Sequence, residues 1–186
     1  MWWLIVLIIV IVLILLIVFG YYNRFTVLQN RINNSFAQID VQLRKRSDLV
    51  PNLVQAVKGY MKHEQKIMKE VTEARKALLK VIPSKDVASK MKAGDALQGA
   101  LKSLFAIAEN YPNLKASENF LHLQRELSAI EDKVAYARQF YNDSILGYNN
   151  LCKTIPGRWF AAMFSKKAGK YLEIPAASRA VPKISF

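Results

Sequence analysis

The sequence has little of the material from which active sites are usually built. Its 186 residues include one cysteine, Cys152, and two histidines, His63 and His122. A lone cysteine excludes an intrachain disulfide, and no glycine-rich phosphate loop is present. The chain also lacks the His-Glu-x-x-His zinc motif and the Glu-x-x-His pairs of di-iron bundles. We therefore expect no catalytic residue, no cofactor and no metal.

The surroundings of the histidines leave a minor alternative open. His122 is four residues from both Glu118 and Glu126, so these side chains share one face of a helix. Metal binding there is the less economical interpretation, because this spacing is not the Glu-x-x-His pattern by which di-iron bundles hold their metals. We expect both histidines to be solvated.

Charge is absent from residues 2–19, which read WWLIVLIIVIVLILLIVF and contain no amide, hydroxyl or proline. As a helix rising ~1.5 Å per residue, this run spans about 27 Å, close to the ~30 Å hydrocarbon core of a bilayer. A helix in a soluble core keeps a polar stripe, and a cleaved signal peptide has a basic start and a small-residue cleavage site. The run has none of these, so we predict an uncleaved transmembrane anchor over residues 1–22.

Residues at the two ends of the run predict its interfaces and its orientation. Aromatic rings prefer the headgroup level, and Lys and Arg beside a span stay on the cytoplasmic side. Basic residues follow the run and none precedes it. We predict an external N-terminus, a cytoplasmic C-terminal domain, and these interfacial residues at the anchor: Trp2, Trp3, Tyr21, Tyr22 and Arg24.

Acidic residues are scarce, at 14 against 27 Lys and Arg, which gives a formal net charge of +13. The excess is densest after residue 156, where aromatic and basic residues alternate. For a tethered chain the nearest polyanion is the lipid surface, and nucleic acid is the weaker candidate. The predicted interfacial residues of this tail are Trp159, Phe160, Phe164, Lys166 and Lys167. Packing on the end of a bundle and disorder remain alternatives for the tail.

Prolines are few, and four of them divide the rest of the chain into stretches with apolar residues three and four apart. These stretches, about 22–47, 49–81, 85–109 and 114–154, each predict a helix. Ser47 and Asp48 are expected to cap the second helix, with Pro51 in its first turn. Short links favour antiparallel neighbours. The predicted fold is all-α: an N-terminal transmembrane helix, an up-and-down antiparallel four-helix bundle over 23–155, and a basic and aromatic tail over 156–186.

Two polar patterns accompany the apolar stripes. Asp40 and Glu64 lie beside core positions, and a half-buried carboxylate needs a partner. We predict that Arg138 or Arg44 supplies it, with exposed charges as the alternative. The second pattern is a repeat, Tyr141-Asn142 followed seven residues later by Tyr148-Asn149. It predicts two tyrosines packed in the core, with a binding groove as the alternative.

Several of these segments resemble the signature of the LemA family. The resemblance rests on Ile39–Arg46, Asp48–Val54 and Val57–Tyr60, on Tyr111–Ala116, and on the Tyr-Asn repeat. Ser47 departs from it, because the family usually has an aromatic residue there. The family includes a magnetosome-associated branch, MamQ. The resemblance implies a single-pass protein of the bacterial plasma membrane with a cytoplasmic helical domain and no settled biochemical activity.

These features favour a non-enzymatic membrane-anchored scaffold of the LemA type, which presents a helical bundle to other membrane-associated proteins. The span lacks the GxxxG motif that drives helix pairing in lipid, so self-association into a homo-oligomer is expected through the bundle. The alternative is a membrane-remodelling or anionic-lipid-binding protein whose tail contacts lipid. Nucleic-acid binding is the weakest hypothesis, because only net charge suggests it.

Overall fold

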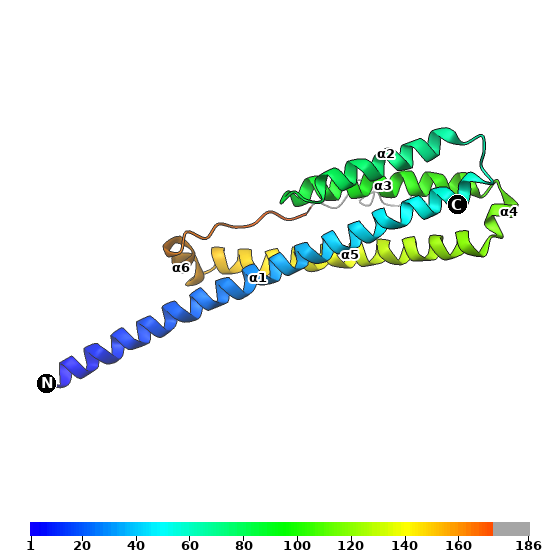
Figure 1. Ribbon diagram of the computed structural model, residues 1–186. Helices are drawn as coiled ribbons and strands as arrows, with labels where there is room; N and C mark the ends of the chain where they lie inside the picture. The colour runs from blue at the N-terminus through cyan, green and yellow to red at the C-terminus, as the bar shows by residue number, and fades with distance from the viewer. Residues whose placement is uncertain (173–186) are drawn as a thin grey trace, which may run out of the picture. The chain divides into compact units, whose positions relative to one another are not determined.

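The computed structural model describes residues 1–172, and these residues form six helices and no strand. The order along the chain is α1 (Trp2–Lys58), α2 (Gln65–Val81), α3 (Val87–Ala108), α4 (Pro112–Lys115), α5 (Glu118–Lys153) and α6 (Gly157–Met163) (Figure 1). The predicted all-α fold, with a long apolar helix at its start and packed helices after it, is confirmed.

The apolar run forms the first third of α1. Its most apolar 18-residue window has a mean hydropathy of 3.6 and contains no buried residue. A helix of a soluble core would bury such a window, because apolar side chains gain free energy by leaving water. Within residues 1–172, α1 is the one helix long and apolar enough to cross a membrane. This indicates membrane anchoring.

The predicted break between the first two helices is wrong, because α1 passes through Pro51 without interruption. A proline inside a helix has no N–H, so the carbonyl four residues earlier loses its donor. Here that carbonyl belongs to Ser47, and Arg75 of α2 donates its Nε–H to it at 2.8 Å. The core positions Val50, Leu53 and Val57 continue the buried stripe of α1 past the proline. The turn into α2 lies at residues 59–64 instead.

The chain divides into two compact units, and α1 and α5 each contribute to both. One unit, which we call the bundle unit, comprises residues 35–139. The other, which we call the anchor unit, comprises residues 1–34 together with the chain from 140 onward.

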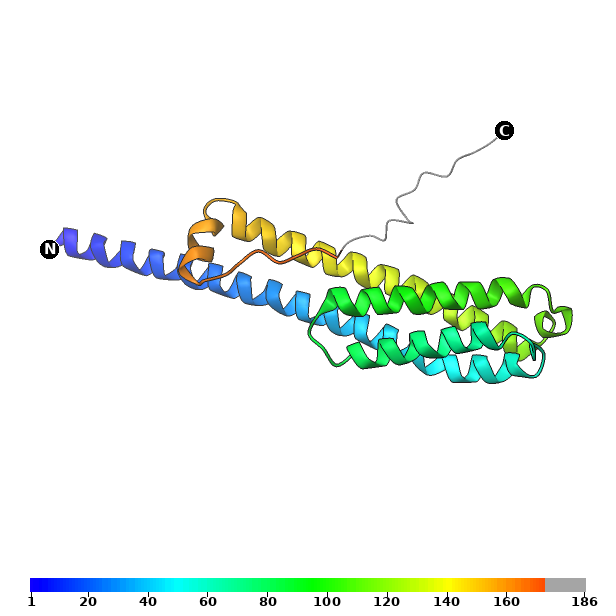
Figure 2. The ribbon, with the colours of Figure 1, turned by 90° about the horizontal axis from the view of Figure 1, so that it is seen from above.

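The bundle unit is an up-and-down arrangement of the second half of α1, α2, α3 and the first half of α5 (Figure 2). Asp40 and Arg46 on α1 bond to Lys90 and to the carbonyl of Gly94 on α3, so these two helices run parallel. Asp95 and Gln98 on α3 bond to Arg138 and Glu131, so α3 and α5 are antiparallel. The side chains that are almost completely buried are mostly aliphatic: Ile39, Leu43, Val50, Leu53, Val57, Met61, Val71, Leu78, Leu97, Leu104 and Leu114.

Short connections join the helices of the bundle unit. Asp86 caps α3 by accepting a hydrogen bond from the N–H of Ala88 at 3.0 Å. The helix predicted over 114–154 begins instead as the single turn α4, which has Pro112 at its start, and α5 follows from Glu118. α3 and α5 match the helices predicted over 85–109 and 114–154, with boundaries shifted by a few residues.

In the anchor unit the tail folds back along α5 (Figure 2). The short helix α6 ends in a turn in which Lys166 donates to Ala161 O at 2.8 Å and Ser165 donates to Ala162 O at 3.1 Å. This pair of hydrogen bonds defines a Schellman motif, in which Ser165 takes a left-handed backbone conformation with a φ of 52°. The motif reverses the chain, and residues 166–172 then run beside α5. The tail beyond residue 172, including Pro175 and Pro182, lies outside the described residues.

Candidate functional site

Six charged side chains meet among the helices of the bundle unit, and we call this group the buried ionic layer. It contains three cations and three anions, so its formal charge is balanced. The members are Asp40 and Arg46 on α1, Lys90 and Asp95 on α3, and Glu131 and Arg138 on α5.

Lys90 and Asp40 form the most buried ion pair of the layer. The lysine is 1 % exposed, and its Nζ lies 2.6 and 2.7 Å from the two carboxylate oxygens of Asp40. The same ammonium lies 4.1 Å from the centre of the Phe36 ring, a cation–π distance. Asp40 keeps 28 % of its side chain exposed. The pair therefore joins α1 to α3 through a buried ammonium group and a partly exposed carboxylate.

Arg46 is also 1 % exposed, and its Nη1 donates to the carbonyl of Gly94 at 3.3 Å. A Cβ at Gly94 would lie 2.7 Å from a terminal carbon of Leu43, so glycine permits the close approach of α1 and α3. Burial lowers the pKa of Arg46, and the negative charge of Glu131 opposes this shift. Within the described structure, Nη2 of Arg46 has no hydrogen-bond partner.

The remaining members of the layer join α3 to α5. Arg138 Nη2 bonds to Asp95 Oδ1, and Glu131 accepts from Gln98. Lys102 also lies 3.1 Å from Glu131. Because removing one partner of a buried pair leaves an uncompensated charge, the layer favours a single register of the helices.

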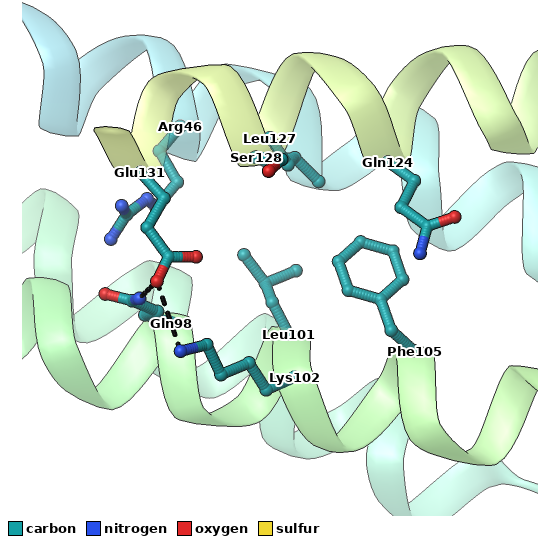
Figure 3. Close-up of a pocket in the computed structure, with 9 residues that line it drawn as sticks. All are labelled: Arg46, Gln98, Leu101, Lys102, Phe105, Gln124, Leu127, Ser128 and Glu131. Carbon is teal, nitrogen blue, oxygen red and sulfur yellow. Dashed lines mark hydrogen bonds and ion pairs between the residues drawn. The ribbon is translucent and has the colours of Figure 1, made fainter. Parts of the chain in front are cut away.

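A small pocket opens between α3 and α5 beside Arg46 (Figure 3). Figure 3 shows the Glu131 carboxylate directed toward Gln98 and Lys102, with Leu101 and Phe105 along the floor. Its volume is about 170 Å³, below the roughly 300–1,000 Å³ of typical small-molecule sites. The geometry fits a polar seam between helices better than a substrate site.

The partners of the predicted polar residues differ from those expected. Asp40 pairs with Lys90 rather than with an arginine, and Arg138 pairs with Asp95. Glu64 accepts a hydrogen bond from the Tyr111 hydroxyl at 3.2 Å. Arg44 is exposed on α1.

The sequence contained a signal for the partners that were missed. Lys90 stands at the start of the buried series Gly94, Leu97, Leu101 of α3, at three- and four-residue spacings. Arg46 stands between the buried positions Leu43 and Val50 of α1 in the same way. A cation at a core position of a helix predicts a buried ion pair, because an unpaired charge there is costly.

The anchor unit carries a second cluster, which we call the aromatic collar: Tyr21, Tyr22, Phe160 and Phe164. The rings of Tyr21 and Phe160 stack, with centroids 4.3 Å apart and an interplanar angle of 12°. The rings of Tyr22 and Phe164 meet edge to face at 5.4 Å. These contacts bring α6 beside the end of the apolar run.

The other predicted interfacial residues are mostly exposed. Trp159 is 65 % exposed, and Arg24 and Lys167 are exposed as well, while Lys166 is half-buried. Trp2 and Trp3 are exposed at the start of α1. Among the described residues of the anchor unit, Asp143 is the one acidic side chain. The basic side chains are Arg24, Arg31, Lys153, Arg158, Lys166, Lys167 and Lys170. The interfacial role of these residues stays a prediction.

The Tyr-Asn repeat on α5 serves two purposes. Tyr141 and Tyr148 are buried, and burial raises the pKa of both phenols. Asn142 and Asn149 instead bond to the backbone of Leu172 and Gly169 in the returning tail. The sequence indicated the tyrosines as core residues but gave no sign of what the asparagines bind.

Comparison with known proteins places these features in a family. The model of the LemA family matches residues 35–186, which is most of the chain. The chain belongs to the LemA family.

The relatives of this LemA family chain include Protein LemA of Metamycoplasma hominis, which is 28 % identical over 123 residues, 66 % of this chain and 55 % of the relative. Magnetosome protein MamQ of Magnetospirillum gryphiswaldense is 25 % identical over 179 residues, 83 % of this chain and 66 % of the relative. Magnetosome protein MamQ 1 of Paramagnetospirillum magneticum is 22 % identical over 175 residues, 82 % of this chain and 64 % of the relative. The chain thus spans between 55 % and 66 % of the length of these curated relatives.

The rarer side chains of this LemA family member lie in unremarkable surroundings. His122 Nε2 is 3.9 Å from Glu126 Oε1 on the exposed face of α5. Within residues 1–172, no group of three or more His, Cys, Asp or Glu side chains could hold a metal ion. Cys152 is buried, and burial raises the pKa of its thiol, although a hydrogen bond with Tyr148 partly opposes the shift.

Proposed function

We propose that this LemA family chain is a non-enzymatic scaffold of the bacterial plasma membrane, which presents its bundle unit to membrane-associated protein partners on the cytoplasmic side. The observation that carries the proposal is α1 itself. One helix contains the exposed apolar run and, from residue 35 onward, a wall of the bundle. A partner that binds the bundle is thereby held at the membrane.

The orientation follows the distribution of basic side chains. Arg24 and Arg31 follow the apolar run closely, and such residues are retained on the cytoplasmic side. The bundle unit comes after them in the chain, so we place it in the cytoplasm.

The scaffold proposal is tested by crosslinking in living cells. A photo-reactive amino acid is placed at an exposed position of α5 in the full-length chain, such as Lys133 or Tyr136. The proposal expects the same one or few membrane proteins to be captured in repeated experiments, identified by mass spectrometry. The matched control places the amino acid at buried Val134. Equal capture from the buried and exposed positions, or capture of lipid alone, contradicts the proposal.

A second candidate function is binding of anionic lipid through α6, which the aromatic collar favours. The rings of Phe160 and Phe164 contact Tyr21 and Tyr22 at the end of the apolar run. Trp159 and its neighbour Arg158 are exposed. A ring beside a cation suits the headgroup region, and each Lys or Arg near an anionic surface contributes ~1 kcal/mol.

The lipid proposal is tested with Trp159 as the only tryptophan. The chain has three tryptophans, so Trp2→Phe and Trp3→Phe leave one emitter in the full-length protein. In vesicles that contain phosphatidylglycerol, brominated lipids should quench Trp159 more strongly than in vesicles of phosphatidylcholine alone. Equal and weak quenching in both vesicles contradicts lipid binding by α6, while the scaffold proposal is unaffected.

A further inference from the structure

Asn142 and Asn149 hold the returning tail by its backbone. The side-chain amide of Asn149 donates to Gly169 O at 3.0 Å, and its oxygen accepts from Gly169 N–H at 2.7 Å. Asn142 makes the same pair of bonds with Leu172, at 3.1 and 2.8 Å. Each asparagine therefore satisfies both polar groups of one peptide residue, as a neighbouring β-strand would.

The spacing of the two asparagines selects an extended peptide. Seven residues of helix separate them, which is about 10.5 Å along α5. The residues they bind, Gly169 and Leu172, are three apart, so the tail advances about 3.5 Å per residue, the rise of a strand. The tail runs antiparallel to α5, because the later asparagine binds the earlier tail residue. A helical or compact peptide would not reach both groups.

The space around tail positions 169 and 172 also limits which side chains the bound peptide can carry there. A Cβ at position 169 would lie 2.7 Å from Cδ1 of Ile145, and Ile145 is itself buried. A side chain larger than glycine would therefore have to displace the terminal methyl group of the buried Ile145. Leu172 is 9 % exposed, so a large apolar side chain suits the second position. Lys170 and Tyr171, which lie between the two positions, are exposed. The pattern that fits is Gly-x-x-Leu.

We propose that Asn142 and Asn149 form a peptide-binding clamp whose ligand is an extended Gly-x-x-Leu segment, and that residues 169–172 of a second copy of this chain can replace those of the same copy. The segment that fits is present in every copy, and the four hydrogen bonds that recognise it are all made to main-chain groups of Gly169 and Leu172. Confinement of copies to one membrane raises their effective concentration. The clamp then links copies through exchanged tails.

This inference deepens the proposed scaffold by naming one way in which it assembles with itself. It depends on the scaffold proposal only for the crowding of copies at the membrane. Association between copies can be measured in detergent micelles, where the outcome does not depend on localisation or on other partners.

Two complementary full-length variants test the exchange. The first carries Asn142→Ala and Asn149→Ala, so it has a free tail and no clamp. The second carries Gly169→Val and Leu172→Ser, so it has a free clamp and no matching tail. The two variants, labelled with different fluorophores, should associate when mixed, and neither should associate with itself. Absence of association in the mixture, or equal association of each variant with itself, overturns the proposal.

A labelled peptide of residues 165–172, SKKAGKYL, measures the clamp directly. It should bind the second variant by fluorescence anisotropy. Each asparagine removed takes away two hydrogen bonds of roughly 1 kcal/mol each, so binding should weaken by about thirtyfold, since 1.4 kcal/mol is one decade. The same peptide with Gly169→Val should not compete. Equal binding by peptides with glycine and valine, or no binding at all, contradicts the clamp.

Controls separate loss of the clamp from loss of the fold. Asn150→Ala changes an exposed asparagine next to the clamp and should leave association and peptide binding unchanged. Asn142→Asp with Asn149→Asp keeps the side-chain size and the acceptor but removes the donor, and should also weaken binding. Each variant is accepted only if its far-ultraviolet circular dichroism equals that of the parent chain.

Discussion

At the scale of single residues, Lys90 and Asp40 share one ion pair but differ in exposure. Lys90 is 1 % exposed, whereas Asp40 keeps 28 % of its side chain in solvent. When one partner of such a pair is removed, the cost depends on whether the remaining charge can reach water. The effects of the two deletions should therefore be unequal.

We predict that Asp40→Ala lowers the free energy of unfolding by about 3–5 kcal/mol, because a buried ammonium is left without its carboxylate. Lys90→Met should cost only about 1 kcal/mol, because Met fills a similar volume and Asp40 can hydrate. Both are measured by urea unfolding of the full-length chain in detergent, followed by circular dichroism. Arg44→Met, at an exposed position, is the control. A larger effect of Lys90→Met than of Asp40→Ala would contradict this interpretation.

Cys152 gives a second test at this scale. Because burial raises the pKa of its thiol, little thiolate is present near pH 8, and the sulfur is poorly accessible. We predict that a maleimide reacts with Cys152 much more slowly than with a cysteine at exposed position 153, in a Cys152→Ser, Lys153→Cys chain. The rates should converge when the protein is unfolded in urea. Similar rates in the native protein would show that the thiol is not buried.

At the scale of elements, the continuity of α1 depends on how its proline is accommodated. Pro51 removes the helical donor to Ser47 O, and Arg75 supplies a replacement from α2 at 2.8 Å. The bond therefore links two helices at the place where Pro51 leaves a carbonyl of α1 without its helical donor. The effect of replacing Arg75 on stability should therefore depend on whether residue 51 is proline.

A double-mutant cycle tests this dependence between Pro51 and Arg75. Arg75→Met should destabilise the chain by about 1.5–3 kcal/mol, the value of a hydrogen bond from a charged group. In a Pro51→Ala background the cost should be smaller, because the N–H of residue 51 then bonds to Ser47 O. Lys76→Met, which removes an exposed bridge to Glu73, is the control and should have almost no effect. Equal costs of Arg75→Met in both backgrounds would contradict the compensation.

The same proline shows where sequence reasoning about elements succeeds and where it fails. Apolar residues at three- and four-residue spacings predicted most of α2, α3 and α5. Pro51 was interpreted as the start of a helix because, in the sequence, a proline near Ser47 and Asp48 resembles a capped N-terminus. Arg75, 28 residues after Ser47 along the chain, replaces the hydrogen bond that Pro51 removes, and local patterns do not contain that contact.

The sequence predicted the helices better than it predicted which charged side chains pair with one another. Asp40 and Arg138 were identified from their positions beside the apolar stripes, but their partners, Lys90 and Asp95, come from α3. Which residues of two helices lie side by side depends on the register and rotation of both, and a one-dimensional pattern fixes neither. The asparagines of the clamp were missed for a similar reason, because their ligand is backbone and backbone is the same at every residue.

At the scale of the whole molecule, one chain joins a membrane anchor to a helical domain. The apolar run and the family match are the observations behind the anchor and the helical domain. The basic residues after the run carry the proposal that the bundle unit lies in the cytoplasm. The buried ionic layer favours one register of the bundle, and assembly of copies through the clamp on α5 is our proposal.

The most direct test of this account is the labelling of single cysteines in intact cells that express the full-length Cys152→Ser chain. One variant carries Trp2→Cys and the other Lys133→Cys, at exposed positions of α1 and α5. With a membrane-impermeant maleimide, the account predicts labelling at position 2 in intact cells and labelling at position 133 only after the membrane is permeabilised. Labelling of position 133 in intact cells, or recovery of the full-length chain in the soluble fraction, would contradict it.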